Sequence, residues 1–180
     1  VLVSTSIFLF GSIVTQSHND PGIGRYIHSS NISNFFGLFG AYVSSVLVSL
    51  FGTASIIISL FVFYAGLIML LGIKSKFLII KFIFVILALI LLNFSLNLLN
   101  VQYFDLGLFA LIVSDIFYNY LPFVENNIYY RFLLGSLLIL FTVFSLMFSF
   151  SIKFQFLTKL INKTVRLLFA LIRKLFSGFR

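Results

Sequence analysis

Long apolar runs separated by short polar stretches dominate this chain of 180 residues. A helix that crosses a bilayer needs roughly 20 consecutive apolar residues. Four segments reach or approach that length, namely residues 1–15, 52–73, 77–99 and 132–152. The pattern predicts an all-α integral membrane protein, with four transmembrane helices in a domain that covers residues 1–152.

The apolar tract between residues 35 and 73 is too long for one crossing, and Gly52 divides it. Before this glycine, small residues recur every four positions, at Gly37, Ala41, Ser45 and Ser49. Such spacing places them on one helical ridge, where another helix or subunit can approach closely in lipid. We expect residues 35–51 to form a short helix that lies at the outer face of the membrane or dips into it.

The few charged residues are strongly segregated, and this predicts the orientation. The chain has 12 Lys and Arg against 4 Asp and Glu, a formal net charge of +8. Most of the cations lie in residues 74–81 or 153–180, whereas all the acids lie in the stretches 16–51 and 100–131. Cytoplasmic loops are enriched in Lys and Arg. Both termini are therefore expected in the cytoplasm, and residues 16–51 and 100–131 are expected to be outer loops.

Residues 153–180 show an amphipathic helical pattern, with apolar residues three or four positions apart and cations on the opposite face. The pattern predicts a cytoplasmic helix that binds anionic lipid headgroups. The cations expected to make this contact are Lys153, Lys159, Lys163, Arg166, Arg173 and Lys174. A seam that joins copies of the chain is a second interpretation. Direct nucleic-acid binding is disfavoured, because the helix lacks polar side chains that read bases.

Composition leaves little material for catalysis. Hydrophobic residues make up 61% of the chain and charged residues 9%, against about 25% charged in a soluble domain. There is no Cys, and His18 and His28 are interpreted as ordinary loop histidines. No phosphate-binding G-x-x-x-x-G-K-[ST] loop occurs. We therefore expect no catalytic residue, no metal site and no cofactor, and this stretch is not expected to be an enzyme.

Two amides lie four residues apart on the third predicted crossing, at Asn93 and Asn97. Hydrogen bonding between helices is their favoured role. If they instead line a polar path, the chain would be a small transporter or a substrate-binding membrane subunit, which is the alternative function. A lipid-modifying enzyme would need clustered His and acids near one membrane face, and the outer loops supply only scattered ones.

A weak internal repeat relates the two halves of the chain. The triplet Gly37-Leu38-Phe39 recurs 70 residues later as Gly107-Leu108-Phe109, and Val43-Ser44 recurs as Val113-Ser114. At the same offset Gly52 faces Pro122, another helix breaker. The repeat predicts a second short outer helix and two parallel halves, although chance similarity is an equal alternative in a chain so rich in Phe and Leu.

The first outer loop carries a more specific pattern. Residues 15–22 resemble the Ser-Tyr-x-Pro-x-Asp-Pro-Ser type of motif of the FtsK/SpoIIIE family of bacterial DNA translocases, and the stretches 34–41 and 51–54 resemble its N-x-x-G-x-x-G-A and F-G-x-A motifs. The matching residues are Asp20, Pro21, Asn34, Gly37, Gly40, Ala41 and Gly52. Gln16 and His18 replace a frequent Tyr and Pro, so a role for those two side chains is not carried over.

This resemblance covers essentially the whole chain, as the amino-terminal membrane domain of the family. It implies a multi-pass anchor in the bacterial inner membrane at the division septum, with membrane proteins of the division machinery as partners. It also implies a homo-oligomer, a hexamer in that family, that serves cell division and chromosome segregation. The ATP-driven motor would lie beyond Arg180.

Overall fold

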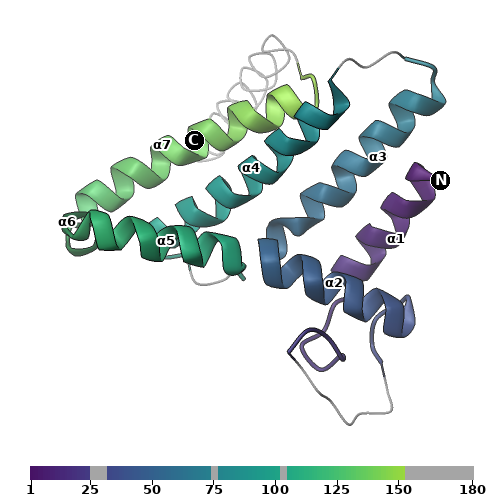
Figure 1. Ribbon diagram of the computed structural model, residues 1–180, viewed down its shortest axis with the longest axis horizontal. Helices are drawn as coiled ribbons and strands as arrows, with labels where there is room; N and C mark the ends of the chain where they lie inside the picture. The colour runs from purple at the N-terminus through teal and green to yellow at the C-terminus, as the bar shows by residue number, and fades with distance from the viewer. Residues whose placement is uncertain (25–31, 74–76, 102–104, 153–180) are drawn as a thin grey trace, which may run out of the picture.

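The computed structural model describes residues 1–24, 32–73, 77–101 and 105–152. The elements within these ranges are all helical (Figure 1). They are α1 (Leu2–Val14), α2 (Gly37–Phe51), a 3-10 turn (Thr53–Ser55), α3 (Ile56–Leu70), α4 (Leu78–Leu98), α5 (Leu108–Tyr120), α6 (Pro122–Asn126) and α7 (Ile128–Ser149). The predicted all-helical class is therefore confirmed for the described part of the chain.

Within the described ranges, three helical segments are long and apolar enough to cross a membrane: Thr53–Leu70, Leu78–Leu98 and Ile128–Ser149. The first predicted crossing is shorter, because α1 has 13 residues and thus a length of about 20 Å, against about 30 Å of hydrocarbon. The last crossing begins at Ile128, earlier than the predicted residue 132. The reason is the Asn127 side chain, which accepts a hydrogen bond from the Tyr129 N–H at 3.0 Å and caps the helix.

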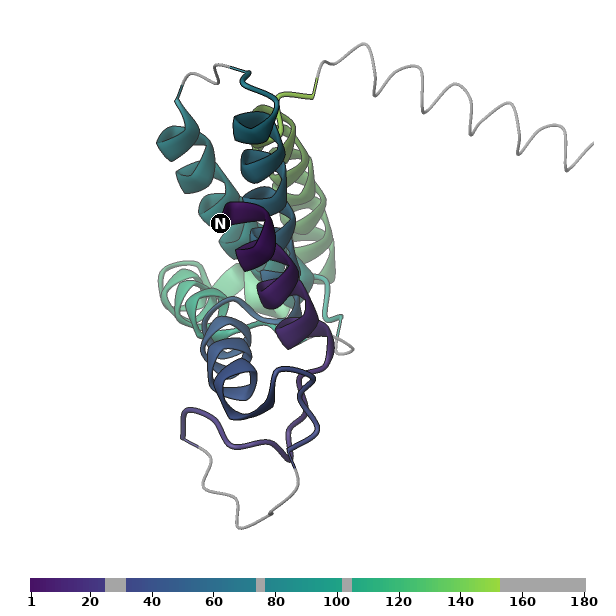
Figure 2. The same cartoon turned by 90° about the vertical axis from the view of Figure 1, so that its right-hand side faces the viewer.

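Four helices form two antiparallel pairs, α1 with α3 and α4 with α7, which we call hairpins, and the helices α2 and α5 lie across one end of both pairs. α1 packs on α3, and α4 packs on α7. Two perpendicular views place α2 and α5 at the same end of these helices (Figures 1 and 2). We call this the short-helix end. The opposite end, which holds Leu71, Phe77 and Ser151, is called the tail end.

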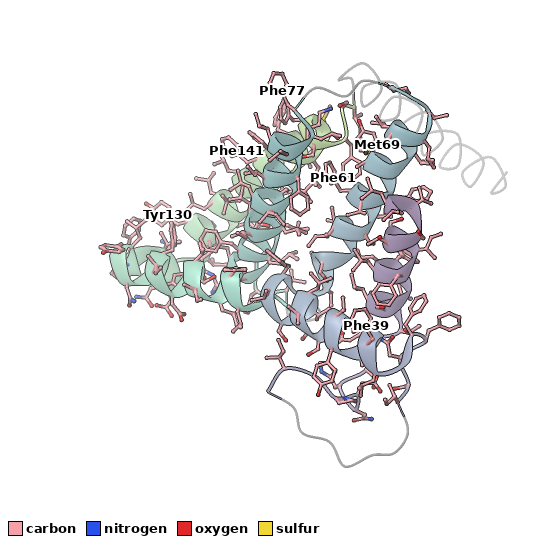
Figure 3. All side chains as sticks on the ribbon, turned by 45° about the vertical axis from the view of Figure 1, so that its right-hand side comes forward. Phe39, Phe61, Met69, Phe77, Tyr130 and Phe141 are labelled. Atoms are coloured by element: carbon pink, nitrogen blue, oxygen red, sulfur yellow. The ribbon has the colours of Figure 1, made fainter. Side chains whose placement is uncertain are left out.

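Many buried side chains are small and polar, whereas many exposed side chains are large and apolar. Among the described residues, the buried set contains as many polar side chains as apolar ones. Most of the buried hydroxyls bond to a carbonyl of their own helix, as Ser59 Oγ does to Ile56 O at 2.7 Å. Large side chains such as Met69 and Phe141 project outward (Figure 3). This is the reverse of a water-soluble core and is typical of helices packed in lipid.

The two halves have the same element order, which supports the predicted repeat. α2 packs on α1 as α5 packs on α4. Gly37 and Gly107, at the starts of the two short helices, both have positive φ, at 61° and 75°. Ser44 and Ser114, which are equivalent in the repeat, each accept a hydrogen bond from an asparagine amide. The halves meet through an apolar cluster of Ile58, Phe61, Val85 and Leu89.

Candidate functional site at the short-helix end

The first loop is closed by a buried carboxylate. Asp20 is 3% exposed, and its Oδ1 accepts hydrogen bonds from the Ser33 N–H at 2.7 Å and from the Ser33 hydroxyl at 2.8 Å. A buried charge is costly unless hydrogen bonds satisfy it. Asp20 Oδ2 has no partner among the described residues. Asp20, at the start of the predicted Asp20-Pro21 turn, thus holds the two ends of the loop together through its hydrogen bonds with Ser33.

A second buried polar side chain joins three segments. Asn34 Nδ2 donates to the carbonyl of Ser12, near the end of α1, at 2.8 Å and to Ser44 Oγ of α2 at 3.5 Å. Its Oδ1 accepts from the Phe36 N–H at 3.1 Å. Gly40 lies directly against this amide, and a β-carbon there would collide with Asn34 Oδ1. Asn34 and Gly40 therefore lock the loop and α2 onto α1.

The small-residue ridge of α2 packs largely inside the chain. Ala41 is 1% exposed and Ser45 is 3% exposed. Ser45 Oγ accepts a hydrogen bond from the Ile23 N–H at 3.1 Å, and Gly22 lies so close to Ser45 that no β-carbon fits. Gly37 and Ser49, at the ends of the ridge, are partly exposed. The middle of the ridge is consequently occupied by the chain's own first loop.

The backbones of the two halves touch where α2 ends and α5 begins. The Thr53 N–H donates to the carbonyl of Asp105 at 3.0 Å. Gly52 has φ 67° and ψ −168°, and a β-carbon on it would overlap the Asp105 carbonyl. Gly107 is equally close to the Gly52 backbone. Both positions require glycine, for conformation and for space.

Asn93 and Asn97 hold both short helices onto α4, which confirms their predicted role in bonding between helices. Asn93 Nδ2 donates to the Phe51 carbonyl at the end of α2 at 2.6 Å, and Asn97 Nδ2 donates to Ser114 Oγ of α5 at 2.7 Å. Because Asn93 is only 1% exposed and both amides bind neighbouring helices, the geometry disfavours the polar path that a transporter would need.

Arg131 is a structural residue that the sequence analysis did not single out. Its Nε donates to the carbonyl of Leu98 at 3.0 Å, and its terminal nitrogen lies 3.5 Å from the carbonyl of Asn97. It thereby caps the last turn of α4, where carbonyls lack partners within the helix. Its contact could have been predicted from its position on the first turn of α7, because that turn lies beside the end of α4 when the two helices pack antiparallel.

A surface cavity of about 360 Å³ opens where α2 ends and α5 begins, beside the first loop. It is lined by His18, Ile23, Val48, Ser49, Asp105, Leu106, Gly107, Leu108 and Leu111. His18 Nε2 lies 3.7 Å from Asp105 Oδ2, with both side chains largely exposed. An exposed pair of this kind contributes little to stability. Within the described ranges, no group of three or more His, Asp and Glu side chains could hold a metal ion.

The remaining predicted residues and the tail end lie away from this site. The lipid-contact cations from Lys153 to Lys174, like His28, lie outside the described residues. At the tail end, Lys81 Nζ of α4 donates to Ser151 Oγ at 2.6 Å, just beyond α7. The exit of α7 is thus tied to the start of α4.

The chain has apolar helices long enough to span a bilayer, many small polar side chains in its interior and many large apolar side chains on its surface. These features define the class of protein: a helical membrane domain. Its family follows from residues 1–165, which match the family described as the 4TM region of DNA translocase FtsK/SpoIIIE. The chain therefore belongs to this family, as its sequence motifs predict. The matched region is a membrane domain and not the motor of the translocase. No curated protein and no solved structure matches the chain.

Proposed function

We propose that this chain anchors an FtsK-like DNA translocase in the bacterial inner membrane and holds its motor at the division septum. The family match over residues 1–165 carries the proposal. The positions of the motif residues support it. Asp20, Asn34, Gly40 and Gly52 contact their own chain, where they fix one end of the bundle. Such an arrangement suits a rigid support for a motor and for partner proteins better than it suits a reaction.

The proposed orientation places the short-helix end outside and the tail end in the cytoplasm. Lys74, Lys76 and Lys81 all lie in the stretch between α3 and α4 or on the first turn of α4, and the strongly basic residues 153–180 follow α7. Cations of this kind remain on the cytoplasmic side. With α1 as a fourth crossing, the motor would continue from the cytoplasmic tail. Membrane proteins of the division machinery would meet the short-helix end, and copies of the chain would assemble, as a hexamer by resemblance.

The test is a fusion of the full chain, through residue 180, to a fluorescent protein in dividing bacteria. We expect enrichment at the septum. Gly52→Val is the matched variant, because it disrupts the short-helix end but changes neither a charge nor a residue of the span Thr53–Leu70. It should reach the membrane but lose septal enrichment. An even distribution of the unmodified fusion around the cell would contradict the septal anchor.

Reading the coding sequence beyond residue 180 tests the motor separately. A linker followed by a G-x-x-x-x-G-K-[ST] loop would support the anchor proposal. A stop codon immediately after Arg180 would contradict it.

A further inference from the structure

The burial pattern of α2 is inverted relative to that of a helix at a water-facing surface. Its buried residues are Gly40, Ala41, Ser44, Ser45 and Val48. Its strongly exposed side chains are instead large and apolar or aromatic: Leu38 is 55% exposed, Phe39 70% and Tyr42 44%. No charged residue occurs between Gly37 and Phe51. The long helices show the same inversion, and on them the exposed side is the side that meets lipid.

The exposed face of α2 continues the lipid-facing surface of the hairpins. The ring of Phe8 on α1 lies 4.8 Å from the ring of Phe36 and 5.4 Å from that of Phe39, measured between centroids. At the other end of α2, the Phe51 and Phe109 rings lie 5.3 Å apart. Aromatic contacts thus link α1 to the start of α2, and the end of α2 to α5.

The exposed surface of α5 has two different flanks. Helical periodicity places Phe109, Ile112, Ile116 and Tyr120 along one flank, and all four are exposed. Asp115 and Asn119, four residues apart, lie on the adjacent flank and are exposed as well. The exposed Leu108 and Leu111 precede them on that side, so the flank is polar in the second half of α5. Ala110 and Ser114 face inward. An apolar flank beside a polar flank is the pattern of a helix that lies in the plane of the membrane interface.

We infer that α2 and α5 lie within a single leaflet of the bilayer, across the short-helix end of the two hairpins. We call this pair of interfacial helices the collar. The apolar faces of both helices contact acyl chains, and the flank with Asp115 and Asn119 faces headgroups and water. α2 has 15 residues and is about 22 Å long, and it lies across the bundle end (Figure 1), so it does not span the membrane. The ligand of this surface is phospholipid, whichever side of the membrane the collar occupies.

The chain contains no tryptophan, so a single introduced one reports its own surroundings. We would prepare Phe39→Trp on α2, Asn119→Trp on the polar flank of α5, and Phe141→Trp near the middle of α7. Each full-length variant would be reconstituted in nanodiscs with lipids brominated near the headgroup or near the chain end. Unchanged circular dichroism and melting temperature would confirm that the variants are folded.

The collar predicts a different quenching pattern at each position. Phe39→Trp should be quenched most by the shallow bromines, and Phe141→Trp most by the deep ones. Asn119→Trp should be quenched by aqueous iodide and only weakly by either lipid. The inference is overturned if Phe39→Trp resembles Asn119→Trp, since its face would then meet water. It is also overturned if deep bromines quench Phe39→Trp most, or if no reagent quenches it because a partner protein or a second copy covers it.

The absence of cysteine allows a second, independent measurement on α5. Ile116→Cys and Asn119→Cys lie less than one turn apart, on the apolar and the polar flank. A membrane-impermeant maleimide added to protein in open nanodiscs should label Asn119→Cys several-fold faster. Equal rates would contradict the orientation assigned to the helix.

Discussion

At the scale of single residues, three asparagine amides connect neighbouring segments of the chain. Asn34, Asn93 and Asn97 each bind an atom of another segment, and two of them lie on α4. Apolar contact between helices gives little preference in lipid, because lipid tails are equally apolar, so packing and directed hydrogen bonds set the arrangement. Small hydroxyl side chains in turn leave room for close approach. These few polar contacts therefore determine where α2 and α5 sit.

We predict that the Asn97–Ser114 hydrogen bond couples α4 to α5. In a double-mutant cycle, Asn97→Ala and Ser114→Ala should each destabilise the chain, and the double variant should lose less than their sum. The expected coupling is about 0.6 kcal/mol, a typical value for hydrogen bonds between membrane helices. Unfolding free energies from SDS titration in mixed micelles provide the measurement. Strict additivity would mean that the 2.7 Å contact contributes no energy.

Two glycines with positive φ differ in the space that a β-carbon would have. Gly52 and Gly72 have nearly equal φ values, 67° and 66°, but a β-carbon overlaps the Asp105 carbonyl only at Gly52 and meets nothing at Gly72. Gly72→Ala should cost about 1–2 kcal/mol, the penalty for the left-handed conformation. Gly52→Ala should cost clearly more, because the alanine would meet the Asp105 carbonyl and would also have to adopt φ 67° with ψ −168°, which glycine alone readily adopts. Melting temperatures in detergent would compare the two variants, and equal losses would refute the close approach.

At the scale of elements, the sequence predicted which segments are helical better than it predicted their contacts. Gly52 marked the end of α2 because a glycine in an apolar run is a helix breaker, and Phe51 is indeed the last residue of α2. The four-residue spacing of the ridge predicted a close contact. It did not reveal that Ser45 would pack against Gly22 and Ile23 of the first loop, because these residues are more than twenty positions apart in the sequence.

We therefore predict that Ala41→Leu destabilises the folded chain itself. Ala41 is 1% exposed, and added volume in a packed interior costs typically about 1–3 kcal/mol. Leu38→Phe adds volume on the exposed face of the same helix and should leave the melting temperature unchanged. Melting in detergent combined with size-exclusion light scattering gives both readouts. A smaller oligomer with an unchanged melting temperature would instead place the ridge at a subunit interface.

At the scale of the whole molecule, the long apolar runs made the helical membrane class predictable, while the distant partners of the buried polar side chains were not. Asn93 binds a carbonyl 42 positions earlier, and Asp20 binds a serine 13 positions later. No local pattern encodes such partners, because they depend on how the hairpins pack. The repeat is a partial exception, since glycines with positive φ and serines that accept a hydrogen bond from an asparagine amide recur at an offset of 70.

Each half is a hairpin with its own short helix, so we predict that the halves insert separately and reassemble. Co-expressed chains covering residues 1–73 and 77–180 should copurify from detergent through a tag on one of them. The contact that should hold them includes Phe61, which is 3% exposed and lies between α3 and α4 (Figure 3). Its ring centroid is 5.8 Å from that of Phe82 and equally far from that of Phe150.

Phe61→Ala tests this interface against a neighbouring control. Loss of a buried Phe costs about 3–5 kcal/mol, which is enough to prevent copurification at low expression. Leu60→Ala should have little effect, because Leu60 is 46% exposed on the lipid side of the same helix. If both variants copurify as well as the unmodified halves, the aromatic cluster does not hold the halves together. The contacts at the short-helix end, Thr53 with Asp105 and Asn93 with Phe51, would then have to be sufficient. If the unmodified halves insert but never copurify, the two hairpins depend on their covalent connection, and the repeat would describe sequence history without describing two independent folding units.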